Sequence, residues 1–233
     1  MRWLAVLIPL ILVACSTTPV TPTPTAIPPT PLPTPAPIPP TATAAPTPEP
    51  APREARTSTG QYFLGKPDAP VTFEMFGDFQ CPVCGEFARS EEPLFFKHYV
   101  DTGKVKFVWR DFTWIGNESV QAAQAARCAG EQGHFWAYHN YLFDNQSGEN
   151  LGQFSRTNLV LFAVSVGLDP VTFTPCLDSQ KDLAALQDAL RFGVSVGVDV
   201  TPAFLINGDL KIGAPPLSRL EALMDSYLAR APH

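Results

Sequence analysis

A run of prolines divides this chain of 233 residues into two parts with different physical properties. Fifteen of its 26 prolines lie between Pro19 and Pro52, mostly in Thr-Pro, Ala-Pro and Pro-Pro steps. Proline fixes φ and removes a backbone donor, and this stretch has no apolar periodicity to bury. We therefore expect residues 16–57 to form an extended, solvated linker. The packed part of the protein is then residues 58–233, a length typical of one domain with a hydrophobic core.

The first fifteen residues have the pattern of an export signal. Arg2 supplies a positive start, and residues 4–13 form an apolar run too short to cross ~30 Å of hydrocarbon comfortably. The run ends in Leu-Val-Ala-Cys, which resembles a bacterial lipobox, so residues 1–15 are predicted as a lipoprotein signal with Cys15 as the acylated residue. An ordinary cleavage site that contains a cysteine is the alternative. A lipid on Cys15 would anchor the domain at the extracytoplasmic face of the cell membrane.

The charge balance excludes one class of partner. The formal net charge is −6 at pH 7, with 16 basic against 22 acidic residues. Proteins that bind nucleic acid carry a basic patch that neutralises phosphates, and this sequence has no such patch. We therefore expect no nucleic-acid partner.

Hydrophobic periodicity in residues 58–233 alternates between strand and helix patterns. The predicted strands are residues 71–76, 105–109, 203–206 and 210–212. Asn207-Gly208 is a strong signal for a hairpin turn between the last two. Helices are predicted at residues 86–99, with a kink or break at Pro93, and at residues 216–230.

From about residue 115 to 195 the pattern is helical throughout. Five helices are predicted in this stretch. The first ends near Gly130, the second contains the aromatic residues from Phe135 to Phe143, and the third ends near Gly167. The fourth begins at the N-cap pair Asp169-Pro170, and the fifth ends at Gly193. The complete order is β-α-β, a helical block, then β-β-α. This order predicts an α/β fold with an inserted helical subdomain.

The segment Cys81-Pro82-Val83-Cys84 carries the chemistry, because it follows a predicted strand and opens a predicted helix. Two intervening residues allow the two sulfurs to close a small disulfide ring. The first sulfur lies at the helix N-terminus, where free N–H groups and the helix dipole stabilise a thiolate. We predict Cys81 as the nucleophile and Cys84, one turn further on and buried, as the resolving thiol of a redox-active disulfide.

Two other interpretations of the pair are weaker. A structural zinc site needs further ligands at short spacing, and His134 and His139 fit core or surface histidines better than zinc ligands. An inert structural disulfide is the second alternative, but so small a loop constrains the unfolded chain little. We expect no metal and no cofactor.

Three segments together resemble the DsbA-like branch of the thioredoxin superfamily, in its lipoprotein form. They are the strand and motif at 71–84, the segment Ala-Arg-Cys-Ala-Gly-Glu-Gln-Gly-His-Phe-Trp at 126–136, and Val-Thr-Pro-Ala-Phe-Leu-Ile-Asn-Gly at 200–208. The resemblance covers about residues 60–230. It implies a thioredoxin fold with a helical insertion at about 115–195. It also implies a cis peptide at Thr201-Pro202 that leaves the Thr201 backbone free to bind an extended substrate.

The resemblance further implies a structural disulfide between Cys128 and Cys176, with two buried free thiols as the alternative.

The sequence departs from the family pattern at the glutamate that such proteins often place six residues before the first cysteine. Here that position is Met75, and the neighbouring Glu74 should point to the other face of its strand. Asp78 is a candidate substitute through water, although an ordinary polar turn residue is the favoured interpretation.

The function that these features imply is oxidation of cysteines in exported proteins by an extracytoplasmic oxidoreductase. A membrane quinone-linked partner of the DsbB or vitamin K epoxide reductase type would reoxidise it. A disulfide reductase or isomerase, for example in cytochrome c maturation, is the alternative that uses the same cysteines. A non-enzymatic binding module is disfavoured, since a binder need not keep both Cys81 and Cys84. Because Val83 is not a histidine, we expect a pair less oxidising than the strongest members of the family.

Overall fold

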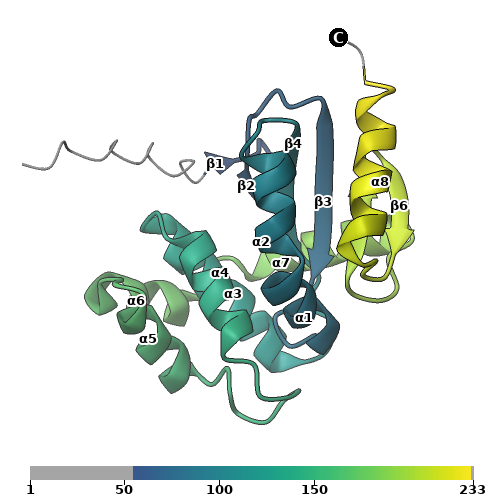
Figure 1. Cartoon of the computed structure of the whole chain (residues 1–233). Helices are drawn as coiled ribbons and strands as arrows, with labels where there is room; N and C mark the ends of the chain where they lie inside the picture. Colours follow the sequence, from purple (N-terminus) through teal and green to yellow (C-terminus); the bar gives the residue numbers. More distant parts are fainter. Residues whose placement is uncertain (1–54, 232–233) are drawn as a thin grey trace, which may run out of the picture. The chain divides into compact units, whose positions relative to one another are not determined.

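A mixed β-sheet forms the centre of the computed structural model, which describes residues 55–231; the predicted signal, Cys15 and nearly all of the predicted linker lie outside this range. Within the described residues the sheet has six strands in the order β1-β2-β4-β3-β5-β6 (Figure 1). The strands are β1 (Ala55–Arg56), β2 (Tyr62–Leu64), β3 (Val71–Gly77), β4 (Val105–Asp111), β5 (Ala203–Ile206) and β6 (Asp209–Ile212).

The two central strands fix the position of the motif that follows β3. Strands β3 and β4 pair in parallel, and β5 pairs antiparallel with β3 on the other side. Side chains of β3 alternate between two faces, so Phe73 and Met75 enter the main core while Phe76 enters a smaller cluster on the opposite face. Both faces of β3 are therefore covered, up to the end of the strand from which the motif follows.

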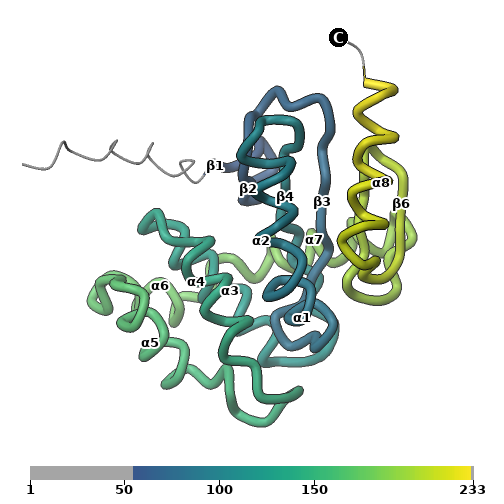
Figure 2. The backbone as a smooth tube through the Cα atoms, in the orientation of Figure 1, coloured from purple at the N-terminus to yellow at the C-terminus, as the bar shows by residue number. Residues whose placement is uncertain are grey.

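Helices cover both faces of the sheet. They are α1 (Pro82–Ser90), α2 (Glu92–Phe95) with the π-helical turn η1 (Phe96–Val100), α3 (Asn117–Glu131), α4 (Phe135–Asp144), α5 (Arg156–Ser165), α6 (Pro170–Ser179), α7 (Leu183–Ser195) and α8 (Leu217–Leu228). Figure 1 shows α2 and α8 in front of the sheet and α7 behind it. The chain leaves the sheet after β4, runs through α3 to α7, and returns at β5 (Figure 2). No helix in residues 55–231 is long and apolar enough to cross a membrane.

The predicted order of elements is confirmed, and several local signals behave as expected. Asp169 caps α6 by accepting a hydrogen bond from the Val171 N–H at 3.0 Å. Asn207 and Gly208 both have positive φ and join β5 to β6. The helix predicted at 86–99 breaks at Glu91, so that Pro93 lies in the first turn of α2, where its missing N–H costs nothing.

Two predictions about element boundaries were wrong. Helix α7 does not end at Gly193 but continues to Ser195, and the left-handed residue that follows is Gly197. Gly193 is required for packing, because a Cβ there would lie 2.7 Å from the Phe112 ring. The sheet also extends further than predicted, since β1 and β2 precede residue 71 and β1 falls inside the stretch assigned to the linker.

A buried ion pair fastens the helical block to the sheet. Arg127 of α3 donates to the Asp111 carboxylate of β4 at 2.9 Å, and Asp111 also accepts from the Trp109 indole at 2.8 Å. The Tyr62 hydroxyl donates to the Arg127 carbonyl at 3.2 Å. These groups satisfy one another in the core, so removing any one partner would leave a buried polar group unpaired.

Glu92, the first residue of α2, is a buried acid outside the predicted site. Its side chain is almost fully buried, and its Oε1 atom has no hydrogen-bond partner within residues 55–231. Burial raises the pKa of Glu92 from 4.5 to about 8. The folded protein therefore keeps this carboxyl protonated at neutral pH, whereas the unfolded chain releases the proton.

We expect Glu92→Gln to remove a pH-dependent loss of stability. The folded pKa lies above the unfolded one, so wild-type stability is fully present below 4.5 and declines as the pH rises to about 8. The free energy of unfolding of the variant should not show this decline, and its gain over wild type at alkaline pH should exceed about 1 kcal/mol. Urea titrations at acidic, neutral and alkaline pH measure the difference, with the exposed Glu86→Gln as control. Parallel pH profiles for wild type and Glu92→Gln would contradict the assignment.

Candidate active site

Cys81 occupies the N-cap of α1, directly after the turn that leaves β3. Its backbone is extended, and its sulfur accepts a hydrogen bond from the Cys84 N–H at 3.3 Å. Pro82 follows in the first helical turn, where the absence of an N–H leaves no donor unpaired. The helix thus begins by directing its unpaired N–H groups at the Cys81 sulfur.

This environment favours the ionised form of Cys81. The pKa of Cys81 is lowered from 9.0 to about 6, chiefly by the hydrogen-bonded thiol of Cys84 and in addition by Thr201 and the backbone N–H groups of Cys84 and Val83. Burial acts in the opposite direction but is outweighed. A thiol with this pKa is mostly thiolate at neutral pH, which is the reactive species in disulfide exchange.

Cys84 has the opposite character. It lies one turn into α1 and is fully buried, and both cysteines are in the dithiol form. Burial raises the pKa of Cys84 well above 9.0, and the adjacent Cys81 sulfur raises it further. The pair therefore consists of one thiol that ionises readily and one that retains its proton.

The Thr201–Pro202 segment lies against the first sulfur. The Thr201–Pro202 peptide bond is cis, and both residues are buried. In the thiol form Cys81 donates to the Thr201 carbonyl oxygen at 3.3 Å, across 120 residues of sequence. The structure therefore brings together Cys81, Cys84, Thr201 and Pro202, the four residues predicted for catalysis and substrate binding.

Of the acidic residues near the site, Glu74 lies as the sequence predicts and Asp78 does not. Met75 is fully buried, and Glu74 points to the other face of β3, where it pairs with Arg110 at 2.5 Å. Asp78 is not an ordinary turn residue, because it is buried and accepts backbone N–H bonds from Gln80 and Ile115 at 2.8 and 3.2 Å. Burial raises the pKa of Asp78 above 3.8, although these hydrogen bonds oppose the shift.

Two glutamines that the sequence analysis did not single out hold the active-site turn. The buried Gln80 donates to the Ser119 hydroxyl at 2.8 Å, at the start of α3. Gln146, after α4, donates to the carbonyl oxygens of Phe79 at 2.6 Å and Cys81 at 3.0 Å. A Cβ on Gly85 would collide with the Gln146 side chain, so the helical block and α1 fit closely at this point.

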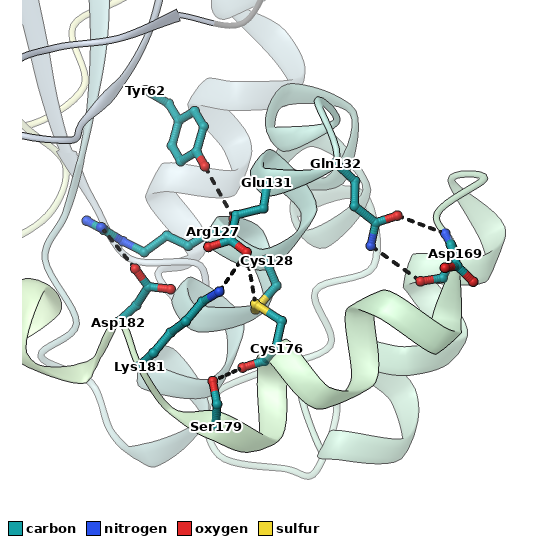
Figure 3. The surroundings of a disulfide bond; sticks show 10 residues. All are labelled: Tyr62, Arg127, Cys128, Glu131, Gln132, Asp169, Cys176, Ser179, Lys181 and Asp182. Atoms are coloured by element: carbon teal, nitrogen blue, oxygen red, sulfur yellow. Dashed lines mark hydrogen bonds and ion pairs between the residues drawn. A yellow bond between two sulfur atoms is a disulfide. The ribbon is translucent and has the colours of Figure 1, made fainter.

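The other two cysteines within residues 55–231 lie in the helical block. Cys128 of α3 and Cys176 of α6 form a disulfide within the helical block (Figure 3). His139 is fully buried, and burial lowers its pKa from 6.5 to about 4, so it is a neutral core residue. Within residues 55–231 no cluster of three or more His, Cys, Asp or Glu side chains could hold a metal ion.

Comparison with known proteins agrees with this geometry. Residues 57–226 match the family described as thioredoxin. The chain belongs to the thioredoxin family. Disulfide bond formation protein D of Bacillus subtilis is 29% identical to this thioredoxin-family chain over 160 residues, which are 64% of this chain and 68% of that protein.

The similarity extends to solved structures and to part of a larger protein. The oxidised BdbD of Bacillus subtilis superimposes with a TM-score of 0.69 at 26% identity, covering 77% of this chain and 98% of that one. Na(+)/H(+) antiporter NhaA 1 of Salinispora arenicola is 30% identical over 167 residues, or 71% of this chain. The chain spans only about a quarter of the length of that antiporter. The predicted thioredoxin fold with a helical insertion, and the predicted membership of the DsbA-like thiol–disulfide oxidoreductases, are confirmed.

Proposed function

We propose that this protein is an extracytoplasmic dithiol oxidase that transfers the Cys81–Cys84 disulfide to reduced cysteines of exported proteins. The observation that carries the proposal is the Cys81 sulfur, which combines a pKa of about 6 with a position against Thr201. The relative named disulfide bond formation protein D supports the oxidative direction. Two thiols suffice for the exchange, so the proposal includes no cofactor and no metal.

The reaction starts from the oxidised enzyme. A substrate thiolate attacks the Cys81 sulfur, the Cys81–Cys84 bond breaks, and Cys84 leaves as a thiolate that takes up a proton. A second substrate thiolate then attacks the substrate sulfur of the mixed disulfide, and Cys81 leaves. Two electrons pass to the enzyme, the substrate gains one disulfide, and the two thiol protons go to Cys84 and to solvent or Cys81. Cys81 is a good leaving group because its thiolate is stabilised.

The residues around Cys81 would have different roles when a substrate binds. Once Cys81 is ionised or oxidised, it no longer donates to the Thr201 carbonyl, which can then accept a hydrogen bond from the backbone of an extended substrate. Pro202 would hold this carbonyl beside the sulfur. Cys128 and Cys176 would serve only the stability of the helical block.

The cellular setting is part of the same proposal. Cleavage directly before Cys15 would leave this residue as the lipid-carrying N-terminus, and the proline-rich stretch between it and β1 would lift the domain from the membrane surface. Reduced enzyme would return its electrons to a quinone-linked membrane partner of the DsbB or vitamin K epoxide reductase type. An anchored domain would meet both this partner and newly exported chains.

The reduction potential tests the direction of electron flow. Stabilising the Cys81 thiolate stabilises the reduced enzyme, so we expect a potential between the ~−270 mV of thioredoxin and the ~−120 mV of DsbA. Equilibration with glutathione buffers measures it, and thiolate absorbance should titrate with a midpoint of about 6. Reduced, unfolded model protein should also gain disulfides when mixed with the oxidised enzyme. A potential at or below that of thioredoxin would favour the reductase or isomerase instead.

A further inference from the structure

Trp114 connects two of the segments that surround Cys81. It follows β4, and its backbone N–H donates to the Asp78 carboxylate at 3.0 Å, three residues before Cys81. Its indole N–H donates to the Thr201 hydroxyl at 3.1 Å. The same residue thus contacts the turn that presents Cys81 and the loop that carries the substrate-binding carbonyl.

The indole ring is both exposed and fixed in place. Trp114 is 48% exposed, although most tryptophans are largely buried. Its two hydrogen bonds come from opposite ends of the residue, one from the backbone and one from the ring. A ring held in this way can receive a ligand without losing conformational entropy at the moment of binding.

The two segments that meet at Cys81 each expose a further apolar side chain. Val83, between the two cysteines, is 46% exposed, and Val200, next to Thr201, is 37% exposed. Isolated exposed apolar residues need no explanation, but these two belong to the segments that meet at Cys81. Trp114 is the largest exposed apolar side chain on the segments that surround Cys81.

We propose that Trp114 is a specificity-determining residue, whose exposed ring packs against a large apolar side chain adjacent to the reactive cysteine of the substrate. The inference rests on the proposed function and names its preferred substrate, an unfolded chain segment with an apolar residue beside the cysteine. A substrate sulfur placed at Cys81 brings the neighbouring residues of its chain alongside Thr201, where the indole lies. Reduced chains that have not folded expose such residues, whereas folded proteins bury them.

Two short peptides test the proposal; each carries two cysteines, and they differ only in the residue preceding the first cysteine, leucine or serine. The second-order rate of their oxidation by the enzyme disulfide is compared for wild type, Trp114→Ala and Trp114→Phe. Leu161→Ala, which truncates a 58% exposed side chain on α5, is the matched control. Dithiothreitol serves as a substrate without side chains, and the pKa of Cys81 is titrated in each variant.

We expect wild type to prefer the leucine peptide and Trp114→Ala to lose roughly tenfold of that preference. Trp114→Phe should keep most of it, because the ring remains, and Leu161→Ala should keep all of it. In Trp114→Ala the rate with the leucine peptide should fall several times more than the rate with dithiothreitol, and the titrated pKa of Cys81 shows how much of any common change passes through Thr201. An equal loss with dithiothreitol and both peptides would show a merely structural role and overturn the proposal. Wild type that oxidises both peptides equally also overturns it, whereas failure to oxidise either peptide contradicts the proposed function itself.

Discussion

Cys81→Ser should abolish disulfide exchange, whereas Cys84→Ala should retain the first bond-forming step and accumulate its product. Serine cannot form a disulfide, and the Cys81 sulfur is the one that lies against Thr201. Cys84 is 0% exposed and Cys81 4%, so a substrate reaches Cys81 first and the role of Cys84 is to attack the mixed disulfide from within. Without it, a substrate bound to Cys81 can leave only through a second thiol of its own.

The experiment uses Cys84→Ala protein whose Cys81 has been activated as a mixed disulfide with thionitrobenzoate. A reduced, unfolded model protein with a single cysteine displaces thionitrobenzoate, and the resulting complex should persist on non-reducing gels. Mass spectrometry should place the bond at Cys81. The same protocol applied to intact cells that secrete their own substrates would identify them and thereby the direction of exchange.

Two controls make the result specific. Cys128→Ala/Cys176→Ala keeps the redox pair and should form no lasting complex, because Cys84 releases the substrate. Cys81→Ser should form none, because its remaining thiol at Cys84 is inaccessible. Complexes formed through Cys84 in Cys81→Ser, or none in activated Cys84→Ala, would refute the assignment of the two roles.

Features that depend on local chemistry could be predicted from the sequence. The two cysteines at the start of a helix specify a thiolate site by spacing alone, and Asn207-Gly208 specifies its turn by backbone conformation. The order of strands and helices follows from hydrophobic period, which is strongest in long, regular elements such as β3 and α3. The three residues of β2 are too few to show a period of two, so that strand escaped prediction.

Features that depend on distant contacts could not be predicted in the same way. Gly193 looks like a helix terminator until Phe112 is seen to occupy the space of its missing side chain. Asp78 looks like a turn residue until Trp114 and Ile115 are seen to donate to it across more than 30 residues. Trp114 itself gave no signal, since its partner Thr201 is 87 residues away.

The disulfide in the helical block should contribute to stability and leave the active site unchanged. Cys128 and Cys176 are separated by 48 residues, and closing a loop of this length is worth roughly 4 kcal/mol in the chain-entropy model. The double variant Cys128→Ala/Cys176→Ala should therefore lose about 2–4 kcal/mol of unfolding free energy. For a domain of this size the midpoint of thermal unfolding should fall on the order of 10 °C.

The neighbouring contacts provide a matched control for this measurement. Lys181 and Glu131 form a partly exposed ion pair beside the disulfide at 2.7 Å, so Lys181→Ala disturbs the same surface without opening the loop (Figure 3). It should cost less than about 1 kcal/mol. The block also stays fastened to the sheet through Arg127 and Asp111, which is why the pKa of Cys81 should not move in the double variant. A double variant as stable as wild type would refute the stabilising role, and a shifted pKa of Cys81 would show that the bridge also supports the redox site.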